Sequence, residues 1–196
     1  MNEIHYMDID DTLFHHPKDD RGVKVHVNDK NGNRIMSLTS AEYPNHKLRD
    51  GELYDFCEFV SADKFAETAL PIFKMIEHTL NIHKNGGKIE LLTGRSDMDN
   101  PDKFGEYLNS HGLNIDEIHV RRAGNIKGRA SETKKLIVSE AIKHNKYNTV
   151  HLYDDSHENL NHFLSLKNDY PDVTFNAHHV HHDEESGITK VTTTRV

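Results

Sequence analysis

The feature that most constrains the fold is a repeated alternation between short apolar runs and segments with helical periodicity. Side chains of a strand alternate between two faces, whereas those on one face of a helix recur about every 3.6 residues. A chain that changes repeatedly between these periods is typical of βαβ units, whose helices cover a mostly parallel sheet. We therefore predict an α/β protein with a Rossmann-like, doubly wound parallel sheet.

The apolar runs and the helical patterns alternate along most of the chain. The runs predict strands at residues 4–9, 88–93, 115–120, 149–153 and 173–180. The helical patterns predict helices at residues 65–83, 102–111, 132–144 and 158–167. In such a sheet, ligands bind beyond the carboxyl ends of the strands, so we expect the chemistry just after these runs.

A segment of about fifty residues between the first strand and the first long helix departs from this alternation. Residues 23–27 and 34–38 alternate as strands do, and the turn-forming pair Asn31-Gly32 lies between them. These features predict a β-hairpin flap or small cap, whereas residues 52–60 show no clear pattern. We interpret the chain as one domain, residues 1–196, with an insertion at approximately residues 15–64.

Length and charge limit the classes of function. The 196 residues allow one core with a modest insertion, and the net charge of −8 favours small anionic substrates over broad contact with nucleic acid. Cys57 is the single cysteine and has no internal disulfide partner, and the N-terminal sequence does not resemble a signal peptide. Because no apolar run approaches membrane-spanning length, we expect a soluble, cytoplasmic protein without a membrane partner.

Histidines are abundant, with 17 in the chain, and four of them gather near the C-terminus at His178, His179, His181 and His182. This cluster raises the hypothesis of a structural zinc site. In an extended segment, however, neighbouring side chains point to opposite faces and would not converge on one ion. We therefore favour a solvated strand end.

The first strand ends in the heptapeptide DIDDTLF, residues 8–14, where three carboxylates follow an apolar run. Crowding of Asp8, Asp10 and Asp11 would raise the pKa of at least one of these acids unless a cation compensates. The segment therefore indicates a divalent ion. An acidic surface turn is the alternative interpretation.

The second core strand ends in TGRS, residues 93–96, which offers phosphate-binding groups at the same edge. Gly94 lets backbone amides approach an anion, Thr93 can donate a hydrogen bond, and Arg95 carries a guanidinium. An ordinary turn accounts for the glycine and the serine but less well for Thr93 and Arg95.

A second acidic strand end and a basic helix start complete the pattern. Residues 153–159, YDDSHEN, place Asp154 and Asp155 at the end of a strand, and hard oxygen ligands of this kind suit Mg²⁺. Capping of the next helix by Asp155 or Ser156 is the structural alternative. Near the start of the helix at 132–144, Lys134 and Lys135 offer a positive charge that could offset these acids.

In this order the four segments resemble the motifs of the haloacid dehalogenase superfamily of phosphotransferases, over approximately residues 4–180. The heptapeptide DIDDTLF matches the first motif, DxDxT, and Thr93 fits the second. Either Lys134 or Lys135 fits the third, and helical phase leads us to prefer Lys135, with Lys134 on the apolar side. The acids of DDS, with Asn159, resemble the fourth motif, although many members carry a further acid where Asn159 stands.

The resemblance implies a fold, a cofactor and roles for individual residues. It implies that Asp8 attacks phosphorus to form an aspartyl-phosphate and that Asp10 is the acid and then the base. It also implies that Thr93 and the lysine bind phosphoryl oxygens. The cofactor would be Mg²⁺, held by Asp8, Asp10 through its main-chain carbonyl, and Asp154 or Asp155.

Substrate identity follows less directly. The expected substrate-binding residues are Thr12, Gly94, Arg95, Arg121 and Arg122. The layout is similar to small 5'-nucleotidases and polynucleotide phosphatases of this superfamily, which implies a small phosphorylated substrate, a nucleotide or a polynucleotide end. A sugar or other small phosphate ester is the alternative.

Two alternatives belong to other classes. A phospho-accepting receiver module also combines acids, a hydroxyl residue and a lysine on a doubly wound sheet, but it has no DxDxT segment, whereas Asp10 here follows Asp8 by two residues. A catalytically silent binding module would lack part of the machinery, yet the sequence retains every group that the chemistry needs. Transfer of the phosphoryl group to an acceptor other than water is also compatible with these residues.

Overall fold

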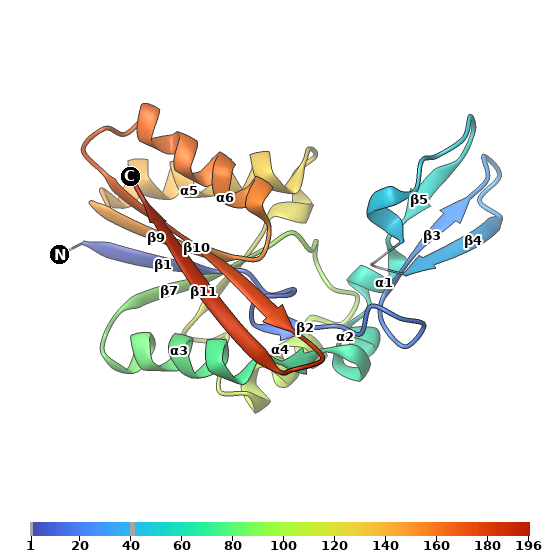
Figure 1. The fold of residues 1–196 in the computed structure, drawn as a ribbon, viewed down its shortest axis with the longest axis horizontal. Coiled ribbons are helices and arrows are strands. Elements are labelled where there is room, and N and C mark those ends of the chain that lie inside the picture. The colour runs from blue at the N-terminus through green and yellow to red at the C-terminus, as the bar shows by residue number, and fades with distance from the viewer. Residues whose placement is uncertain (1, 40–41) are drawn as a thin grey trace.

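A six-stranded sheet with the order β11-β10-β9-β1-β7-β8 forms the centre of the protein (Figure 1). The computed structural model describes residues 2–39 and 42–196, so Ser40 and Ala41, within the predicted insertion, lie outside the described residues, as does Met1. The strands are β1 (Glu3–Met7), β7 (Lys88–Thr93), β8 (His119–Arg122), β9 (Thr149–Asp154), β10 (Thr174–Asp183) and β11 (Ile188–Arg195). All neighbours pair in parallel except β10 and β11, which form an antiparallel hairpin.

Helices cover both faces of this sheet, which confirms the predicted doubly wound α/β class (Figure 1). Helices α3 (Phe73–Lys84) and α4 (Pro101–Ser110) lie on one face, and α5 (Ala130–Asn145) and α6 (His157–Leu164) lie on the other. The alternation of strand side chains divides the buried residues between two clusters, with Met7 and Leu91 toward α3 and α4 and Tyr6 and Leu152 toward α5 and α6. This burial anchors the strands whose ends carry the predicted chemistry.

A small antiparallel unit is inserted after β1, beyond the carboxyl ends of the central strands (Figure 1). The predicted hairpin is confirmed as β3 (Lys24–Asn28) and β4 (Arg34–Thr39), and Gly32 adopts a positive φ of 84° in its turn. A third strand, β5 (Leu53–Asp55), pairs with β3 in the segment that showed no sequence pattern. The remaining elements of this region are β2 (Phe14–His15), the 3-10 helix η1 (Tyr43–Asn45), α1 (Cys57–Val60), α2 (Ala62–Thr68) and β6 (Leu70–Pro71).

The prediction of one continuous helix at 65–83 is wrong. Helix α2 ends at Thr68, Leu70 and Pro71 form β6, which pairs with β2, and α3 begins only at Phe73. Pro71 supplies the physical reason, because it lacks a backbone N–H and its ring clashes with the preceding helical turn.

Two predictions at strand level also need correction. Residues 115–118 belong to a turn in which Ile118 N–H donates to the Asn114 carbonyl, so β8 starts later than predicted, at His119. The last predicted strand continues to Asp183, and the chain then turns at Gly187 and returns as β11, which was not predicted. The predicted helix at 158–167 divides into α6 and the 3-10 helix η3 (Ser165–Asn168).

None of the helices in the described part of the chain combines the length and the apolar character needed to cross a membrane.

Candidate active site

Three carboxylates converge where β1 and β9 end. These strands are paired neighbours, with Met7 opposite Tyr153, so Asp8 directly after β1 lies beside Asp154 and Asp155 at the end of β9. Carboxylate oxygens of the three acids lie within 4.8 Å of one another. Hard oxygen donors at this separation form a candidate site for a cation such as Mg²⁺.

Lys134 is the positive charge at this site. Its Nζ lies 2.9 Å from Asp8 Oδ1 and 2.7 Å from Asp154 Oδ2, and the residue is 2% exposed. Burial alone would lower the pKa of Lys134. The negative charges of Asp154 and Asp8 have a larger, opposite effect, so the pKa lies above its ordinary value. Lys134 therefore carries a fixed charge between two acids.

The prediction that Lys135, rather than Lys134, is the lysine beside the acids is wrong. The Lys135 side chain is partly exposed, and its Nζ lies 4.0 Å from Asp169, away from Asp8. The buried face of α5 contains Lys134 together with Val138 and Ile142. Helical phase had placed Lys134 on the apolar side correctly, but two carboxylates at the end of that face make the buried position favourable for a lysine.

The two acids of β9 differ in their hydrogen bonds. Asp154 is fully buried, and its carboxylate accepts hydrogen bonds from the Ser156 N–H, from Asn159 Nδ2 and from Lys134. Among the described residues, none other than Asp155 itself donates a hydrogen bond to the Asp155 carboxylate. Asp154 thus holds the lysine and the start of α6, whereas the carboxylate of Asp155 is free to bind a cation.

The pKa values of the acids reflect a local excess of negative charge. Burial, followed by the charges of Asp154 and Asp11, raises the pKa of Asp155 to about 7. Burial also raises the pKa of Asp8, and although Lys134 opposes this effect, the pKa remains well above its ordinary value. A divalent cation among these oxygens would favour their ionised forms.

Asp10 belongs to a separate ion pair. Its carboxylate accepts hydrogen bonds from Arg95, with Nε 2.8 Å from Oδ2 and Nη2 2.7 Å from Oδ1, and His16 Nε2 lies 3.1 Å from Oδ1. Burial alone would raise the pKa of Asp10. The charge of Arg95 and the hydrogen bonds with His16 and Arg95 together have a larger, opposite effect, so the pKa lies below its ordinary range. Arg95 also donates to the carbonyl oxygen of Phe59 in α1. The Arg95 guanidinium, which we expect to bind substrate, therefore donates its hydrogen bonds to Asp10 and to the insertion.

The remaining groups of the first two motifs lie near this edge. Thr93 is fully buried, and its hydroxyl accepts the Arg95 N–H at 3.1 Å, while Gly94 lines the cavity over the acids. The Thr12 hydroxyl is buried and has no hydrogen-bond partner among the described residues. An added Cβ at Gly124, in the 3-10 helix η2 (Ala123–Asn125), would lie 2.5 Å from the Gly94 carbonyl oxygen, so only glycine fits against this loop.

Arg121 and Arg122, which we expect to contact substrate, pair with acids outside the acidic group. Arg121 Nε lies 3.0 Å from the carboxylate of Glu90 on the neighbouring strand β7. Arg122 Nε lies 3.3 Å from Asp97, and its guanidinium also lies over the ring of Phe104. Each arginine forms an ion pair with a different acid, and neither lines the cavity that contains Asp8.

A cavity of about 490 Å³ opens over the acids and continues between the core and the insertion. Its floor includes Asp8 and Asp155, and its outer wall is apolar and aromatic, with Tyr43, Phe56 and Phe59 from the insertion. The ring centroids of Tyr43 and Phe56 are 5.6 Å apart in an edge-to-face contact. The inserted unit thus supplies an aromatic wall opposite the carboxylates.

Three of the four C-terminal histidines on β10 make different contacts, and His181 is exposed. His178 Nε2 lies 2.9 Å from His151 Nδ1, and His182 Nδ1 lies 2.9 Å from the Thr189 hydroxyl. His179 Nε2 donates to the main-chain carbonyl of Asp155 and stacks on His157. His179 therefore contacts the acidic strand end, whereas His178 points toward β9.

Several residues at the site were not found by sequence reasoning. They are His16, Tyr43, Phe56 and Phe59 in the insertion, and Gly124 in η2, all in segments that showed no motif. The first four approach the acids because the insertion folds back over the sheet, whereas Gly124 packs against the Gly94 loop. Comparison with family models, with curated proteins and with solved structures finds no match to this chain. The chemistry assigned to it therefore rests on the residues of the site itself.

Proposed function

We propose that this chain is a Mg²⁺-dependent phosphomonoester hydrolase that forms an aspartyl-phosphate on Asp8. The observation that carries the proposal is Lys134 Nζ between Asp8 and Asp154, with the carboxylate of Asp155 within 4.8 Å of both acids. This arrangement combines a nucleophile, a fixed positive charge and cation ligands in one small space.

Each residue has a distinct task in the proposed first step. An Asp8 carboxylate oxygen attacks phosphorus, the bond to the leaving oxygen breaks, and an acyl phosphate remains on Asp8. Asp8, Asp155 and the main-chain carbonyl of Asp10 would hold Mg²⁺, which when bound supplies positive charge for the phosphoryl oxygens. Lys134 neutralises further charge, and Asp154 keeps its ammonium group in place.

Asp10 is the proposed acid in the first step and the base in the second. It protonates the leaving oxygen, then accepts a proton from the water that attacks phosphorus and restores Asp8. Because Arg95 and His16 lower its pKa in the free protein, this role requires substrate binding to loosen the Arg95 contact. His16, at 3.1 Å from the Asp10 carboxylate, is placed to share the proton.

The proposed substrate class is a nucleotide or a nucleic-acid end. The aromatic wall of Tyr43, Phe56 and Phe59 offers rings on which a base can stack, in the same cavity as Asp8 and Asp155. The net charge of −8 disfavours extended contact with a nucleic-acid backbone, so recognition would concentrate on the terminal nucleotide.

The test is phosphate release from p-nitrophenyl phosphate and a panel of nucleoside and sugar monophosphates, with and without Mg²⁺. We expect release that depends on Mg²⁺, that Asp8→Asn abolishes, and that is faster for nucleotides than for sugar phosphates. Phe56→Ala should raise KM for nucleotides and leave p-nitrophenyl phosphate turnover almost unchanged. Equal activity of wild type and Asp8→Asn would refute the proposed nucleophile.

A further inference from the structure

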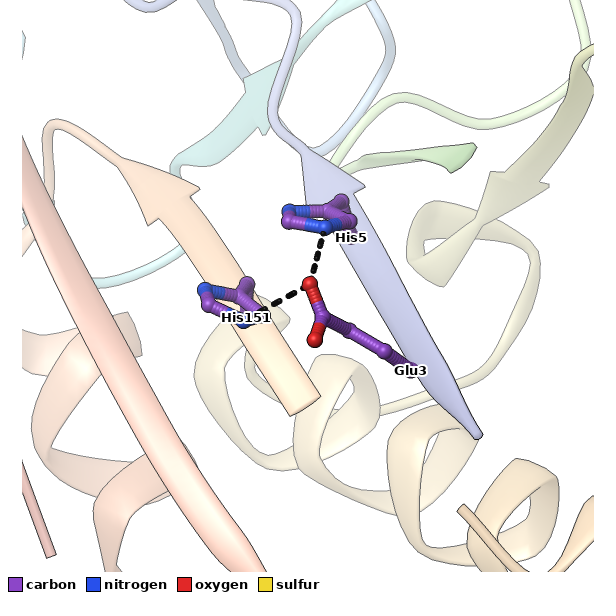
Figure 2. Close-up of side chains that lie close together, drawn as sticks. All are labelled: Glu3, His5 and His151. Carbon is purple, nitrogen blue, oxygen red and sulfur yellow. Dashed lines mark hydrogen bonds and ion pairs between the residues drawn. The ribbon is translucent and has the colours of Figure 1, made fainter. Parts of the chain in front are cut away.

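A second group of metal-ligand side chains lies on the sheet face that also carries α3, away from the strand ends. His5 on β1 and His151 on β9 occupy directly paired positions, and Glu3 lies two residues before His5 on the same face of β1 (Figure 2). Glu3 Oε1 is 2.8 Å from His5 Nε2 and 3.4 Å from His151 Nε2. Three potential ligand atoms of this group lie within 4.8 Å of one another.

The surroundings of Glu3, in the part of the chain that the structure describes, leave its charge without a positive partner. Within the described residues, neither a lysine nor an arginine lies at ion-pair distance from Glu3, although its side chain is only 33% exposed. A carboxylate therefore faces two imidazole nitrogens, with no lysine or arginine of the described residues beside it.

A second layer of hydrogen bonds orients His151. Its Nδ1 lies 2.9 Å from His178 Nε2, and His178 Nδ1 lies 2.8 Å from the Thr193 hydroxyl. When His151 Nδ1–H donates to His178, its Nε2 keeps a lone pair directed toward Glu3. Metal-binding histidines are commonly oriented in this way, with the second ring nitrogen bonded to a neighbouring acceptor.

We propose that Glu3, His5 and His151 bind a divalent transition-metal ion of the zinc class. Two imidazoles and one carboxylate suit Zn²⁺ and leave a position for water, whereas the all-oxygen group at Asp8 suits Mg²⁺. Ligands about 2.1 Å from a tetrahedral ion are about 3.4 Å apart. The Glu3–His151 distance of 3.4 Å equals this spacing, and the Glu3–His5 distance of 2.8 Å must lengthen when the ion binds.

Binding requires a small movement of the two rings. They are stacked, with centroids 4.2 Å apart and planes 18° apart, so each must turn about its Cβ–Cγ bond to direct its lone pair at one ion. This torsion has a broad energy minimum in histidine, which makes the movement inexpensive. The bound ion would link β1 to β9 and stabilise the two central strands.

Isothermal titration calorimetry of the untagged chain with Zn²⁺ tests this proposal. Excess Mg²⁺ is present to occupy the acidic site. We expect one Zn²⁺ per chain in wild type and in the control His144→Gln, whose side chain is 80% exposed. Glu3→Gln and His151→Phe should weaken binding at least about tenfold, and His178→Phe should weaken it about 10- to 100-fold. Circular dichroism checks that each variant is folded.

A measurement on wild type alone guards against variants that fail to fold. In nitrogen-15 spectra of the imidazole side chains, Zn²⁺ should shift the Nε2 resonances of His5 and His151 at one equivalent. Zinc binding that is unchanged in both Glu3→Gln and His151→Phe would overturn the proposal. So would shifts confined to other histidines, or the absence of stoichiometric uptake by wild type.

Discussion

Replacing Asp155 by asparagine should stabilise the protein when no divalent ion is present. Burial and the neighbouring acids raise the pKa of Asp155 from 3.8 to about 7 in the folded state. Since the folded-state pKa exceeds the unfolded one, the neutral acid's contribution is complete below about pH 3.8 and is lost as pH rises through about 7. A difference of about 3 pH units corresponds to about 4 kcal/mol of unfolding free energy at about pH 8.

Asparagine has the shape of the neutral acid but never ionises. In a chelator at about pH 8, Asp155→Asn should therefore be more stable than wild type by up to about 4 kcal/mol, and the difference should almost vanish at about pH 4. Mg²⁺ should narrow the difference to about 1 kcal/mol, because it stabilises wild type by about 2.7 kcal/mol at 100 times its dissociation constant and the variant lacks a ligand. Urea denaturation followed by circular dichroism measures each value.

The control is Asp116→Asn, which removes an exposed carboxylate far from the acidic strand ends in sequence and should change stability little at either pH. If Asp155→Asn is less stable than wild type in chelator at about pH 8, the ionised Asp155 carboxylate does not destabilise the folded protein as argued above. A difference that is the same at both pH values would contradict the same reasoning.

Other predictions concern the lysines, the histidine stack and one glycine. Lys134→Met should abolish phosphate release and lower the unfolding free energy by about 3–5 kcal/mol, because it leaves the charges of Asp8 and Asp154 without a cation. Lys135→Met should retain activity, and kinetics with urea denaturation of both variants check this. Burial, with the charges of His151, His5 and His78, lowers the pKa of His178 to about 3, so the unfolded chain binds more protons than the folded chain below about pH 6.5. The unfolding free energy should therefore fall more steeply in wild type than in His178→Phe as pH decreases from about 6.5 to about 4, and parallel slopes would contradict this. Gly124→Ala should push the Gly94 loop away and lower kcat, and unchanged kinetics would show that the loop accommodates a methyl group.

The central sheet could be predicted from sequence because its elements are locally determined. The strand at Lys88–Thr93 is a continuous buried run, the helix at Pro101–Ser110 has strong apolar periodicity and clear ends, and the structure has both at or near the predicted residues. The predicted helix at 65–83 failed where a single local rule, the effect of Pro71, outweighs a continuous apolar pattern. Strand β11 was missed because its polar, threonine-rich sequence is stabilised by pairing with β10 rather than by burial.

Prediction of the candidate site depended on whether its residues follow strand ends. Asp8, Asp154 and Asp155 follow two strands that pair, so their meeting could be inferred from topology alone. Sequence could not show that Arg95 would bind Asp10, because that contact depends on the loop after β7 folding toward the first motif. The aromatic wall likewise depends on how the insertion folds over the sheet, which local patterns do not determine.

The most direct test of the proposed mechanism is to trap the phosphorylated enzyme. Wild type is mixed with a phosphorylated substrate and Mg²⁺, quenched in acid within the first turnover, digested and analysed by mass spectrometry, with Asp8→Asn treated in parallel. We predict one phosphoryl group on the peptide that contains Asp8, removable by hydroxylamine as an acyl phosphate would be, and none on the variant. Substrate turnover without a phosphorylated Asp8 peptide, or a phosphoryl group on another residue, would contradict the account.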